Sequence, residues 1–334
     1  MVPFQLPLMQ GGSSYLMDTK IKIGVVAINL NANYWSFAPE MLWGLDTFFL
    51  KHPSIRDKYD VKFLLWSDVP EEPVKIQQRL AEYMLSRGEA TSSVINEKDA
   101  HILVPADKRK DLDQVVNNLA NLRKSVKVFE AEPIEWPMPT LMRYHLFLQQ
   151  EEELRKFDYI FYIDVDMRIT DWIGEEILGD GLTAAQHPMY ALRRNYMPPY
   201  EPNPKSSAYI PRPGRVTEED GKKKFEQFYY AGGFQGGKTD DFIKAMKVMR
   251  KNVDEDFSRN YIAIWNDETH WNRYLFENPP SVVLNPSYIY PDSLIDRYYV
   301  PLWGRNYSPK IMTLTKSFTT SKAGGEAVNK MLSL

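Results

Sequence analysis

The sequence contains no cysteine, no long apolar run and no large excess of charge of either sign. Without cysteine, disulfides and thiolate metal sites are excluded. No stretch approaches the roughly 18 apolar residues that a membrane-spanning helix needs. A formal net charge of −3 over 334 residues gives no electrostatic reason to expect nucleic acid or an anionic membrane surface as a partner. We therefore expect no nucleic-acid partner and no transmembrane segment.

The N-terminal segment 1–20 also lacks the features of a targeting sequence. It has neither a basic region nor a long apolar stretch, so it is not typical of a signal peptide. We expect this segment to be flexible. The whole chain of 334 residues is 43% hydrophobic and 13% aromatic, which is enough for one large core or two small ones.

Short apolar runs alternate with helical patterns in the first half of the chain. β-branched and apolar runs predict buried strands, and apolar spacing predicts helices between them. This alternation predicts an α/β sheet with both faces covered, in which ligands bind beyond the carboxyl ends of the strands. The predicted strands are 21–30, 60–68, 126–131 and 158–164, and the predicted helices are 38–50 and 139–157.

The second half is less regular. Residues 193–225 are rich in Pro, Ser and charge, and this composition predicts a long loop. Residues 226–237 predict a strand followed by a glycine turn, and helices are expected at 238–252 and 265–276. Earlier in the chain, residues 71–125 are charged and mostly helical in pattern.

Two aspartates, Asp164 and Asp166, directly follow the most hydrophobic predicted strand in the string "FYIDVDMRI". In extended backbone, alternate side chains point the same way, so these two carboxylates can share one hard cation. Mg²⁺ and Mn²⁺ prefer oxygen ligands, keep some of their waters and bind substrate phosphates. The string alone leaves open a second interpretation, in which the pair simply begins a surface loop.

The glycine string "YYAGGFQGG" supplies a second candidate feature. Glycine within a strand weakens it and often marks the close approach of a ligand or of another backbone. Gly232 and Gly233 would form a shelf without side chains, although a bulge and a tight turn explain the glycines equally well. The string fits no phosphate-loop pattern.

The string "WNDETH" places Asp267 and Glu268 at the start of a predicted helix, beside Trp265. The helix dipole stabilises acidic residues there by a few tenths of a kcal/mol, which is one explanation of the pair. A functional explanation is a cleft for a sugar, whose apolar C–H face suits an aromatic ring. His187 and His270 are better explained as buried or surface histidines, and the five histidines show no zinc-hydrolase spacing.

Eight strings in one order closely resemble glycosyltransferase family 6, which includes the ABO blood-group transferases and the α-1,3-galactosyltransferases. The similarity runs over about residues 126–290, with weaker similarity over 21–53 and in the C-terminal tail. The matching strings are "KVFEAEPIEW", "LMRY", "YIDVDM", "HPMYA", "YEPNPKSSAYIP", "FYYAGGFQGG", "WNDETHWNRY" and "LNPSYIY".

The resemblance implies a GT-A fold: a Rossmann-like mixed sheet flanked by helices, in a single domain with a closing C-terminal tail. It implies that residues 21–334 form the catalytic domain and that 71–125 are a helical insertion. Donor and metal would bind to 126–190 and the acceptor to 226–314, while 315–334 would be mobile. It also implies retaining transfer of GalNAc or Gal from a UDP-sugar, in α-1,3 linkage, to a galactose-terminated acceptor, with a fucosylated galactose as one candidate.

The resemblance further implies roles for individual residues. Asp164 and Asp166 would bind Mn²⁺ (or Mg²⁺), Asp267 would hold the donor sugar, and Glu268 would be the nucleophile or stabilise the reacting carbon. Trp265, Glu268 and His187 would contact the acceptor. The other donor-binding residues would be Asn29, Leu30 and Asn31 at the uracil, Tyr34 beside the base, Arg143, Val165, Gly232, Gly233, Lys316 and Lys322.

Some features depart from the family pattern. Lys322 replaces a usual arginine and cannot pair with phosphate in the bidentate manner. Asn266 replaces a histidine before the acidic pair. In the blood-group transferases that the chain resembles, glycine rather than a larger residue at this position accompanies the use of GalNAc, so the resemblance implies that the small Ala231-Gly232-Gly233 pattern favours UDP-GalNAc over UDP-Gal. The absence of a membrane anchor suggests a soluble, cytoplasmic microbial or viral member rather than a trimmed Golgi enzyme.

Two other functions are compatible with parts of this pattern. One is a catalytically inactive nucleotide-sugar or glycan-binding module of the same fold, which the intact acidic residues disfavour. The other is a metal-dependent phosphoryl- or nucleotidyltransferase of a different α/β fold. That function requires more acidic metal ligands and a glycine-lysine phosphate loop, which the sequence lacks.

Overall fold

The computed structural model describes residues 20–31, 34, 37–68, 125–191, 198–211, 216–219, 222–225, 229–292 and 307–315. Apart from one residue each (Lys20, Ser125 and Thr315), three predicted segments lie outside these ranges. They are the N-terminal segment 1–20, the insertion 71–125 and the tail 315–334.

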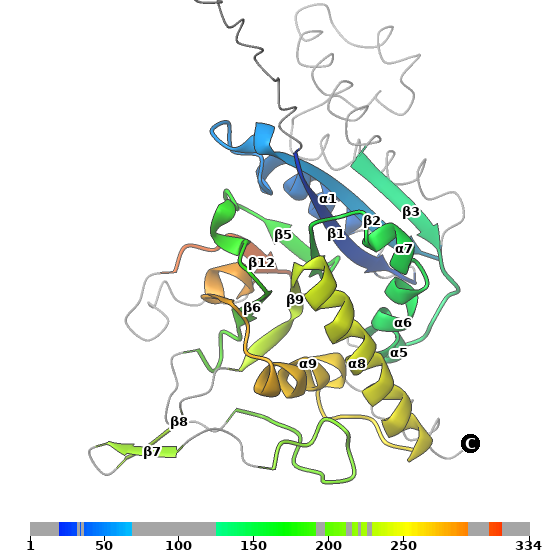
Figure 1. The fold of residues 1–334 in the computed structure, drawn as a ribbon, viewed down its shortest axis with the longest axis vertical. Helices are drawn as coiled ribbons and strands as arrows, with labels where there is room; N and C mark the ends of the chain where they lie inside the picture. The colour runs from blue at the N-terminus through cyan, green and yellow to red at the C-terminus, as the bar shows by residue number, and fades with distance from the viewer. Residues whose placement is uncertain are drawn as a thin grey trace, which may run out of the picture.

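A seven-stranded mixed sheet forms the centre of the fold, with the strand order β10-β6-β9-β4-β1-β2-β3 (Figure 1). β1 is parallel to β2 and to β4, whereas β9 is antiparallel to both β4 and β6. This confirms the predicted α/β class. The strands are β1 (Ile21–Asn29), β2 (Tyr59–Ser67), β3 (Val126–Glu130), β4 (Tyr159–Ile163), β6 (Leu182–Gln186), β9 (Tyr230–Lys238) and β10 (Val282–Leu284).

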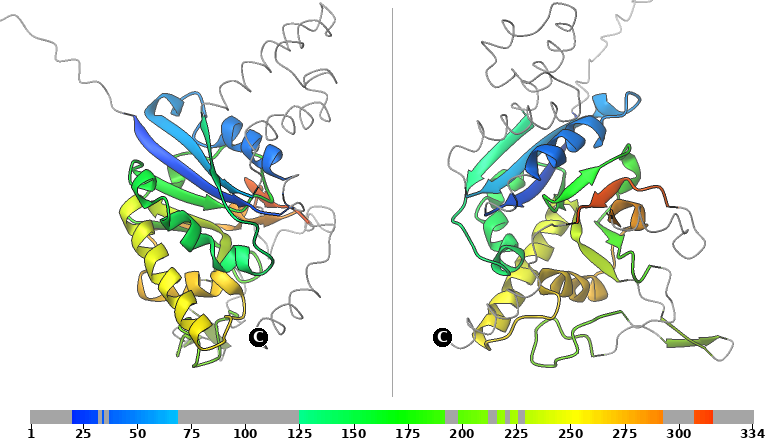
Figure 2. Two further views of the ribbon diagram at one scale, coloured as in Figure 1. Left: turned by 90° about the vertical axis from the view of Figure 1, so that its right-hand side faces the viewer. Right: turned by 180° about the vertical axis from the view of Figure 1, so that it is seen from behind.

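Helices cover both faces of this sheet (Figure 2). Side chains alternate along β1, so Val25 packs in the core cluster that contains α1 (Ala38–Phe48). Val26 faces the other way, into the cluster that contains residues of α6, α8 and α9. These helices are α6 (Arg143–Leu148), α8 (Thr239–Ser258) and α9 (Asn266–Glu277). Because both faces are buried, the strands are almost continuously apolar, as the sequence indicated.

A small second sheet lies beside the end of β4. It has the order β11-β12-β5 and consists of β5 (Met167–Ile169), β11 (Tyr290–Pro291) and β12 (Ile311–Thr313). β12 pairs with β5, and the backbone N–H of Leu314 donates to the carbonyl of Asp166 over 3.0 Å. The C-terminal part of the described chain therefore fixes the segment that follows the two aspartates.

The remaining elements are short. A two-stranded hairpin of β7 (Val216–Glu219) and β8 (Lys222–Phe225) lies within the loop that was predicted over 193–225. The other short elements are η1 (Arg56–Lys58), α5 (Met138–Leu141), α7 (Glu151–Leu154), η3 (Glu175–Ile177) and η4 (Pro286–Tyr288). Within the described residues, no helix has both the length and the apolar character needed to cross a membrane.

Two predictions of secondary structure are wrong. The single helix expected over 139–157 is three short helices, because Gln150 has non-helical backbone (φ −112°, ψ 31°) and bonds of the i→i+3 type tighten the chain around it. Each short helix still directs its apolar residues to the core, and for this reason the sequence shows the apolar spacing of a helix over the whole segment. The glycine turn expected before 237 is also absent: β9 continues through Lys238, because β4 and β6 both pair with it.

Candidate active site

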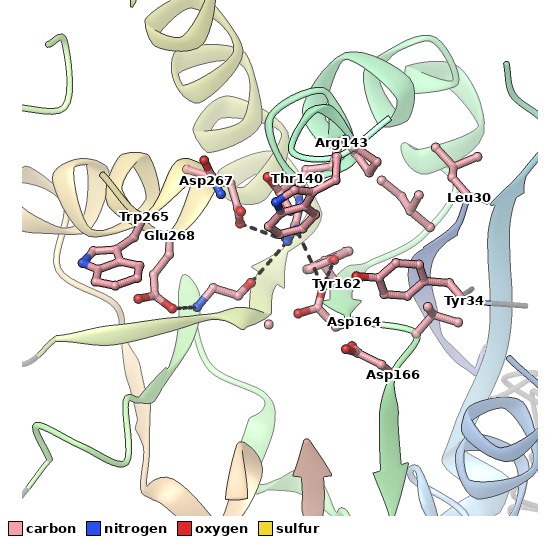
Figure 3. Close-up of a pocket in the computed structure, with 17 residues that line it drawn as sticks. Leu30, Tyr34, Thr140, Arg143, Tyr162, Asp164, Asp166, Trp265, Asp267 and Glu268 are labelled. Atoms are coloured by element: carbon pink, nitrogen blue, oxygen red, sulfur yellow. Dashed lines mark hydrogen bonds and ion pairs between the residues drawn. The ribbon is translucent and has the colours of Figure 1, made fainter. Parts of the chain in front are cut away.

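A pocket of about 290 Å³ opens where β1 and β4 end and α9 begins (Figure 3). Parallel strands commonly present ligand sites beyond their carboxyl ends. The pocket is lined by Ile28, Leu30, Tyr34, Trp136, Pro139, Thr140, Arg143, Tyr162, Asp164, Val165, Asp166, Gly232, Gly233, Trp265, Asn266, Asp267 and Glu268.

The aspartate pair lies on one wall of the pocket, directly after β4. The N–H of Asp164 donates to the carbonyl of Gly233 over 3.1 Å, which ties the end of β4 to β9. The hydroxyl of Tyr162, two residues earlier on the same face, donates to the Asp164 carboxylate. The side chain of Asp164 is 32% exposed, whereas Asp166 is buried. The prediction that the pair enters a cleft, rather than beginning an ordinary surface loop, is consistent with this placement.

Arg143 supplies a buried positive charge between the two walls of the pocket. Its guanidinium lies 3.0 Å from Asp267 Oδ2 and 3.6 Å from Asp164 Oδ1, and its plane lies over the Tyr162 ring at 4.2 Å. Burial opposes the charge, but Asp267 and other nearby groups outweigh this effect and raise the pKa of Arg143. The arginine is therefore permanently charged and links the two acidic pairs.

Asp267 and Glu268 form the opposite wall, in the first turn of α9. Glu268 is half-buried and accepts a hydrogen bond from the N–H of Gly232 over 2.8 Å. Burial acts to raise the pKa of Asp267, while Arg143 at 3.0 Å acts to lower it. Burial raises the pKa of Glu268 to about 7 against the Gly232 hydrogen bond, so Glu268 can change its protonation state near neutral pH.

Gly232 and Gly233 allow β9 to approach both acidic pairs closely. A Cβ atom at Gly232 would lie 2.9 Å from the Cβ of Glu268 and 3.3 Å from its Cα. A Cβ atom at Gly233 would contact only the ends of two side chains, Met167 Cε and Asp164 Oδ2. Packing against α9 therefore requires a glycine at position 232, whereas a Cβ at position 233 would displace side-chain ends beside the aspartate pair.

Trp265 stands at the mouth of the pocket beside Glu268 (Figure 3). It is 52% exposed although it is a large apolar residue. Its N–H donates to Thr269 Oγ1 over 3.0 Å, and its carbonyl accepts from the N–H of Glu268, so the start of α9 fixes its backbone. Asn266 follows with a positive φ of 49°. An exposed indole next to a carboxylate can bind the apolar face of a sugar while the carboxylate accepts from its hydroxyls.

The structure brings most of the predicted residues together. Leu30, Tyr34, Arg143 and Val165 line the same pocket as the two acidic pairs. Asn29 and Asn31 do not line it: Asn29 is fully buried, and the N–H of Asn31 donates to Asp68 over 2.9 Å. Lys316 and Lys322 lie outside the described residues.

The two histidines that the sequence singled out lie away from the pocket lining. His187 packs against Tyr190 and Tyr229, and burial lowers its pKa to about 4. A direct contact between His187 and an acceptor therefore remains a prediction. His270 is fully buried, 3.8 Å from Asp256, and burial lowers its pKa to about 4 as well, in agreement with the interpretation of a core histidine.

Sequence reasoning missed several residues of the site. Tyr162 was detectable, because it precedes Asp164 by two positions in a strand and must share its face. Thr140 and Trp136 carry no local signal, since they reach the pocket only through the position of the short helix α5 and of the turn before it. Gln235 was read as part of the glycine string, but its amide lies 2.8 Å from the Gly232 carbonyl and 3.4 Å from Asp267 Oδ2.

The residues present fit a divalent cation that is only partly held by protein. Within the ranges that the structure describes, no three His, Asp or Glu side chains converge on one point. Asp164 and Asp166 offer a pair of carboxylates at the pocket wall. Mg²⁺ and Mn²⁺ are commonly held by one or two carboxylates, with waters and substrate phosphates completing the shell. A nucleoside diphosphate in the pocket would provide those phosphates.

Comparisons with known proteins agree with these observations. The sequence model of glycosyltransferase family 6 matches residues 101–299. Histo-blood group ABO system transferase 1 of Rattus norvegicus is 34% identical over 191 residues, which are 57% of this chain and 51% of that protein. Globoside alpha-1,3-N-acetylgalactosaminyltransferase 1 of Homo sapiens is 34% identical over 138 residues, 41% of this chain and 36% of that protein.

A bacterial relative is matched over more of its length. O-antigen biosynthesis glycosyltransferase WbnI of Escherichia coli is 27% identical over 193 residues, which are 58% of this chain and 74% of that protein. The chain spans about half the length of the rat relative and little more than a third of the human one.

Proposed function

The chain belongs to glycosyltransferase family 6, and we propose that it is an active transferase of the GT-A fold that moves a sugar from a nucleotide donor to a glycan hydroxyl. The observation that carries this proposal is the placement of two acidic pairs on opposite walls of one pocket. The pair Asp164 and Asp166 suits a cation and a diphosphate, and the pair Asp267 and Glu268 suits a sugar. A module that only binds a nucleotide or a glycan would not need both acidic pairs.

On the donor side, Asp164 and Asp166 would hold Mn²⁺ or Mg²⁺. When bound, the cation would neutralise charge on the diphosphate leaving group. Leu30 and Tyr34 line the part of the pocket next to β1 and would contact the uracil. We propose that Asn29 and Asn31 shape this part from outside the lining, and that Lys316 and Lys322 contact the diphosphate.

On the sugar side, Asp267 would accept a hydrogen bond from a donor-sugar hydroxyl, since Arg143 and Gln235 hold one of its oxygens. Val165, Gly232 and Gly233 would leave space for the sugar ring. Trp265 would pack against the acceptor, with Glu268 within reach of the reacting carbon and of an acceptor hydroxyl. Excluding water from this space favours transfer over hydrolysis.

The reaction exchanges one bond at the anomeric carbon. The bond from that carbon to the β-phosphate oxygen breaks, and its electron pair leaves with UDP. An oxygen of the acceptor forms the new bond and gives up its hydroxyl proton. Retention follows from either of two routes. In the first, ionised Glu268 forms an ester with the anomeric carbon as UDP leaves, and the acceptor oxygen then displaces Glu268 as a carboxylate. In the second, the acceptor enters on the face from which UDP leaves. In both routes the hydroxyl proton of the acceptor passes to the diphosphate of the departing UDP.

The protonation state of Glu268 bears on both routes. Its raised pKa of about 7 means that an ionised nucleophile and a neutral carboxylic acid are both populated near neutral pH. Arg143 lies between the walls and stabilises negative charge on either side of the sugar. The geometry is thus compatible with both routes.

For the donor, we propose UDP-GalNAc in preference to UDP-Gal. Support comes from the small Ala231-Gly232-Gly233 pattern and from relatives that are named as N-acetylgalactosaminyltransferases. Gly232 is required by the packing of α9 alone, so the space for an acetamido group depends on Gly233 and its neighbours. One methylene in a pocket corresponds to about 1–3 kcal/mol, so the preference should be modest, roughly 10- to 200-fold in kcat/KM.

For the acceptor, we propose a galactose-terminated glycan, linked α-1,3 in the product, with a fucosylated galactose as one candidate. The test is UDP release by the purified full chain from UDP-GalNAc and UDP-Gal with Mn²⁺, followed by a glycan array of galactosides. We expect release with both donors, faster with UDP-GalNAc, and a product with an α-configured anomeric proton by NMR. UDP binding without release from either donor would support the inactive module instead.

A further inference from the structure

Gln235 is a buried polar residue in the middle of the sheet. It lies on β9, paired with Tyr162 of β4 and Ala184 of β6, and it is fully buried. Neighbouring positions in the strand are apolar or glycine. A buried amide is costly unless both of its ends find partners, so a glutamine at this position requires a specific explanation.

Both ends of the Gln235 side chain are bonded, and the partners fix its orientation. The carbonyl of Gly232 can only accept, so the group that faces it at 2.8 Å is the amide nitrogen Nε2. The other end, Oε1, then accepts from the hydroxyl of Tyr144 over 2.8 Å. Tyr144 is itself fully buried in α6, so the tyrosine holds the amide in one rotamer.

The amide is aimed at the acidic pair of α9. Gln235 Nε2 also lies 3.4 Å from Oδ2 of Asp267, the same oxygen that Arg143 contacts at 3.0 Å. Two donors on one carboxylate oxygen restrict the rotation of the carboxyl group. Arg143 alone would not fix it, because the arginine is shared with Asp164 and with the Gly232 carbonyl.

Gly232 lies between this contact and the second carboxylate. Its carbonyl receives Gln235 and Arg143, while its N–H donates to Glu268 over 2.8 Å. The carbonyl and the N–H belong to the two different peptide groups on either side of the Gly232 Cα. Gln235 therefore holds the peptide between Gly232 and Gly233 together with Asp267, whereas the preceding peptide makes the contact to Glu268.

We propose that Gln235, held by Tyr144, is a positioning residue that orients the Asp267 carboxylate toward the donor sugar. Its kinetic consequence rests on the proposed transferase function. Gln235 does not line the pocket, so it acts through Asp267 and leaves the nucleotide contacts unchanged.

The test uses Gln235→Met, which keeps the length of the side chain without its hydrogen bonds, and the milder Tyr144→Phe. The readouts are kcat and KM for UDP release from UDP-GalNAc with Mn²⁺, and the calorimetric Kd of UDP. We expect kcat to fall about 10- to 50-fold in Gln235→Met and about 3- to 10-fold in Tyr144→Phe, with the Kd of UDP within twofold of the wild type.

A double-mutant cycle with Asp267→Asn separates positioning from a general loss of stability. If Gln235 acts through Asp267, Gln235→Met lowers kcat less than twofold further in the Asp267→Asn background. Thr183→Val is the matched control. Thr183 lies on the neighbouring strand β6, away from the pocket, and the variant removes the buried 2.8 Å hydrogen bond from its hydroxyl to the Ile177 carbonyl of η3. It should lower Tm while leaving kcat unchanged.

The outcomes are distinct. Wild-type kcat in Gln235→Met and Tyr144→Phe, or a full-sized effect of Gln235→Met in the Asp267→Asn background, would overturn the positioning role while the transferase function stands. If Gln235→Met does not fold, Tyr144→Phe carries the same cycle. A wild-type chain that neither binds UDP-GalNAc nor releases UDP would overturn the proposed function, and this inference with it.

Discussion

The pocket is walled by two acidic pairs that look alike in the sequence but are built differently. Asp267 and Glu268 are held by donors of the protein itself: Arg143 and Gln235 for the first, the N–H of Gly232 for the second. The side chain of Asp267 is 8% exposed, against 32% for Asp164. Arg143 is also closer to Asp267, at 3.0 Å, than to Asp164, at 3.6 Å.

The difference in how the two pairs are held suggests that their negative charges serve different purposes. Carboxylates that are oriented by buried donors are preorganised and cost little reorganisation during a reaction. A partly exposed carboxylate such as Asp164, which lines the pocket beside the buried Asp166, can exchange water for a cation brought with the substrate. We therefore assign the α9 pair to the sugar and the pair after β4 to the cation, and the following predictions test that division.

The largest effect is expected from the pair after β4. Asp166→Asn should lower kcat/KM for UDP release with Mn²⁺ by 10³-fold or more, on the order of 4 kcal/mol of transition-state stabilisation, while the free energy of unfolding changes little. EDTA should abolish wild-type activity. Equal activity in EDTA and in Mn²⁺ would show that the reaction does not use the cation.

The second effect concerns Glu268. If it is the nucleophile, Glu268→Gln should lower kcat by at least about 100-fold, since general acid–base and nucleophilic groups contribute about 10²–10⁴. Wild-type kcat should also fall as pH drops below about 7, because protonation removes the nucleophile from a carboxyl group whose pKa burial raises to about 7. A variant that keeps most of its kcat would eliminate the covalent route and leave the same-face route.

A third effect appears in stability. Asp267→Asn leaves the buried charge of Arg143 without its nearest partner, so we expect a loss of about 2–4 kcal/mol in the free energy of unfolding. Asp164→Asn should cost less than about 1 kcal/mol, because that contact is longer and partly exposed. Urea unfolding of both variants measures the contrast, and equal losses would contradict the division between the pairs.

The smallest effect is a pH dependence of stability. Burial raises the pKa of Glu268 from 4.5 to about 7, so ionisation of this group disfavours the folded state. The penalty is absent below pH 4.5 and fully present above about pH 7. Glu268→Gln should therefore match the wild type at pH 4 and exceed it by about 1–2 kcal/mol at pH 8, allowing for the partial exposure of the carboxylate. The same difference at both pH values would contradict this.

The comparison of the two acidic pairs also indicates which parts of the site could be predicted from the sequence. The end of β4 was predictable because apolar alternation locates the strand and spacing places Asp164 and Asp166 beyond it. The acidic start of α9 was predictable for a similar local reason. That these two segments meet in one pocket came from the order of the family strings, since no local pattern brings residues a hundred positions apart together.

What could not be predicted depends on tertiary contact. The end of the glycine string was predicted to be a turn after a strand, whereas β4 and β6 pair with it from both sides and extend the strand through Lys238. The role of Gln235 depends on its hydrogen bonds to Tyr144 and Gly232, which lie at the two ends of its amide. β5 is a three-residue strand that exists because β12, more than 140 positions later, pairs with it. Contacts of this range leave no periodic signal.

The most direct test of the central claim is a calorimetric titration of UDP into the wild-type chain and into Asp166→Asn, each with Mn²⁺ and with EDTA. If Asp164 and Asp166 bind the diphosphate through a cation, UDP binds the wild type in Mn²⁺ and loses most of its affinity in EDTA and in the variant. UDP binding of equal strength under all four conditions would contradict the claim.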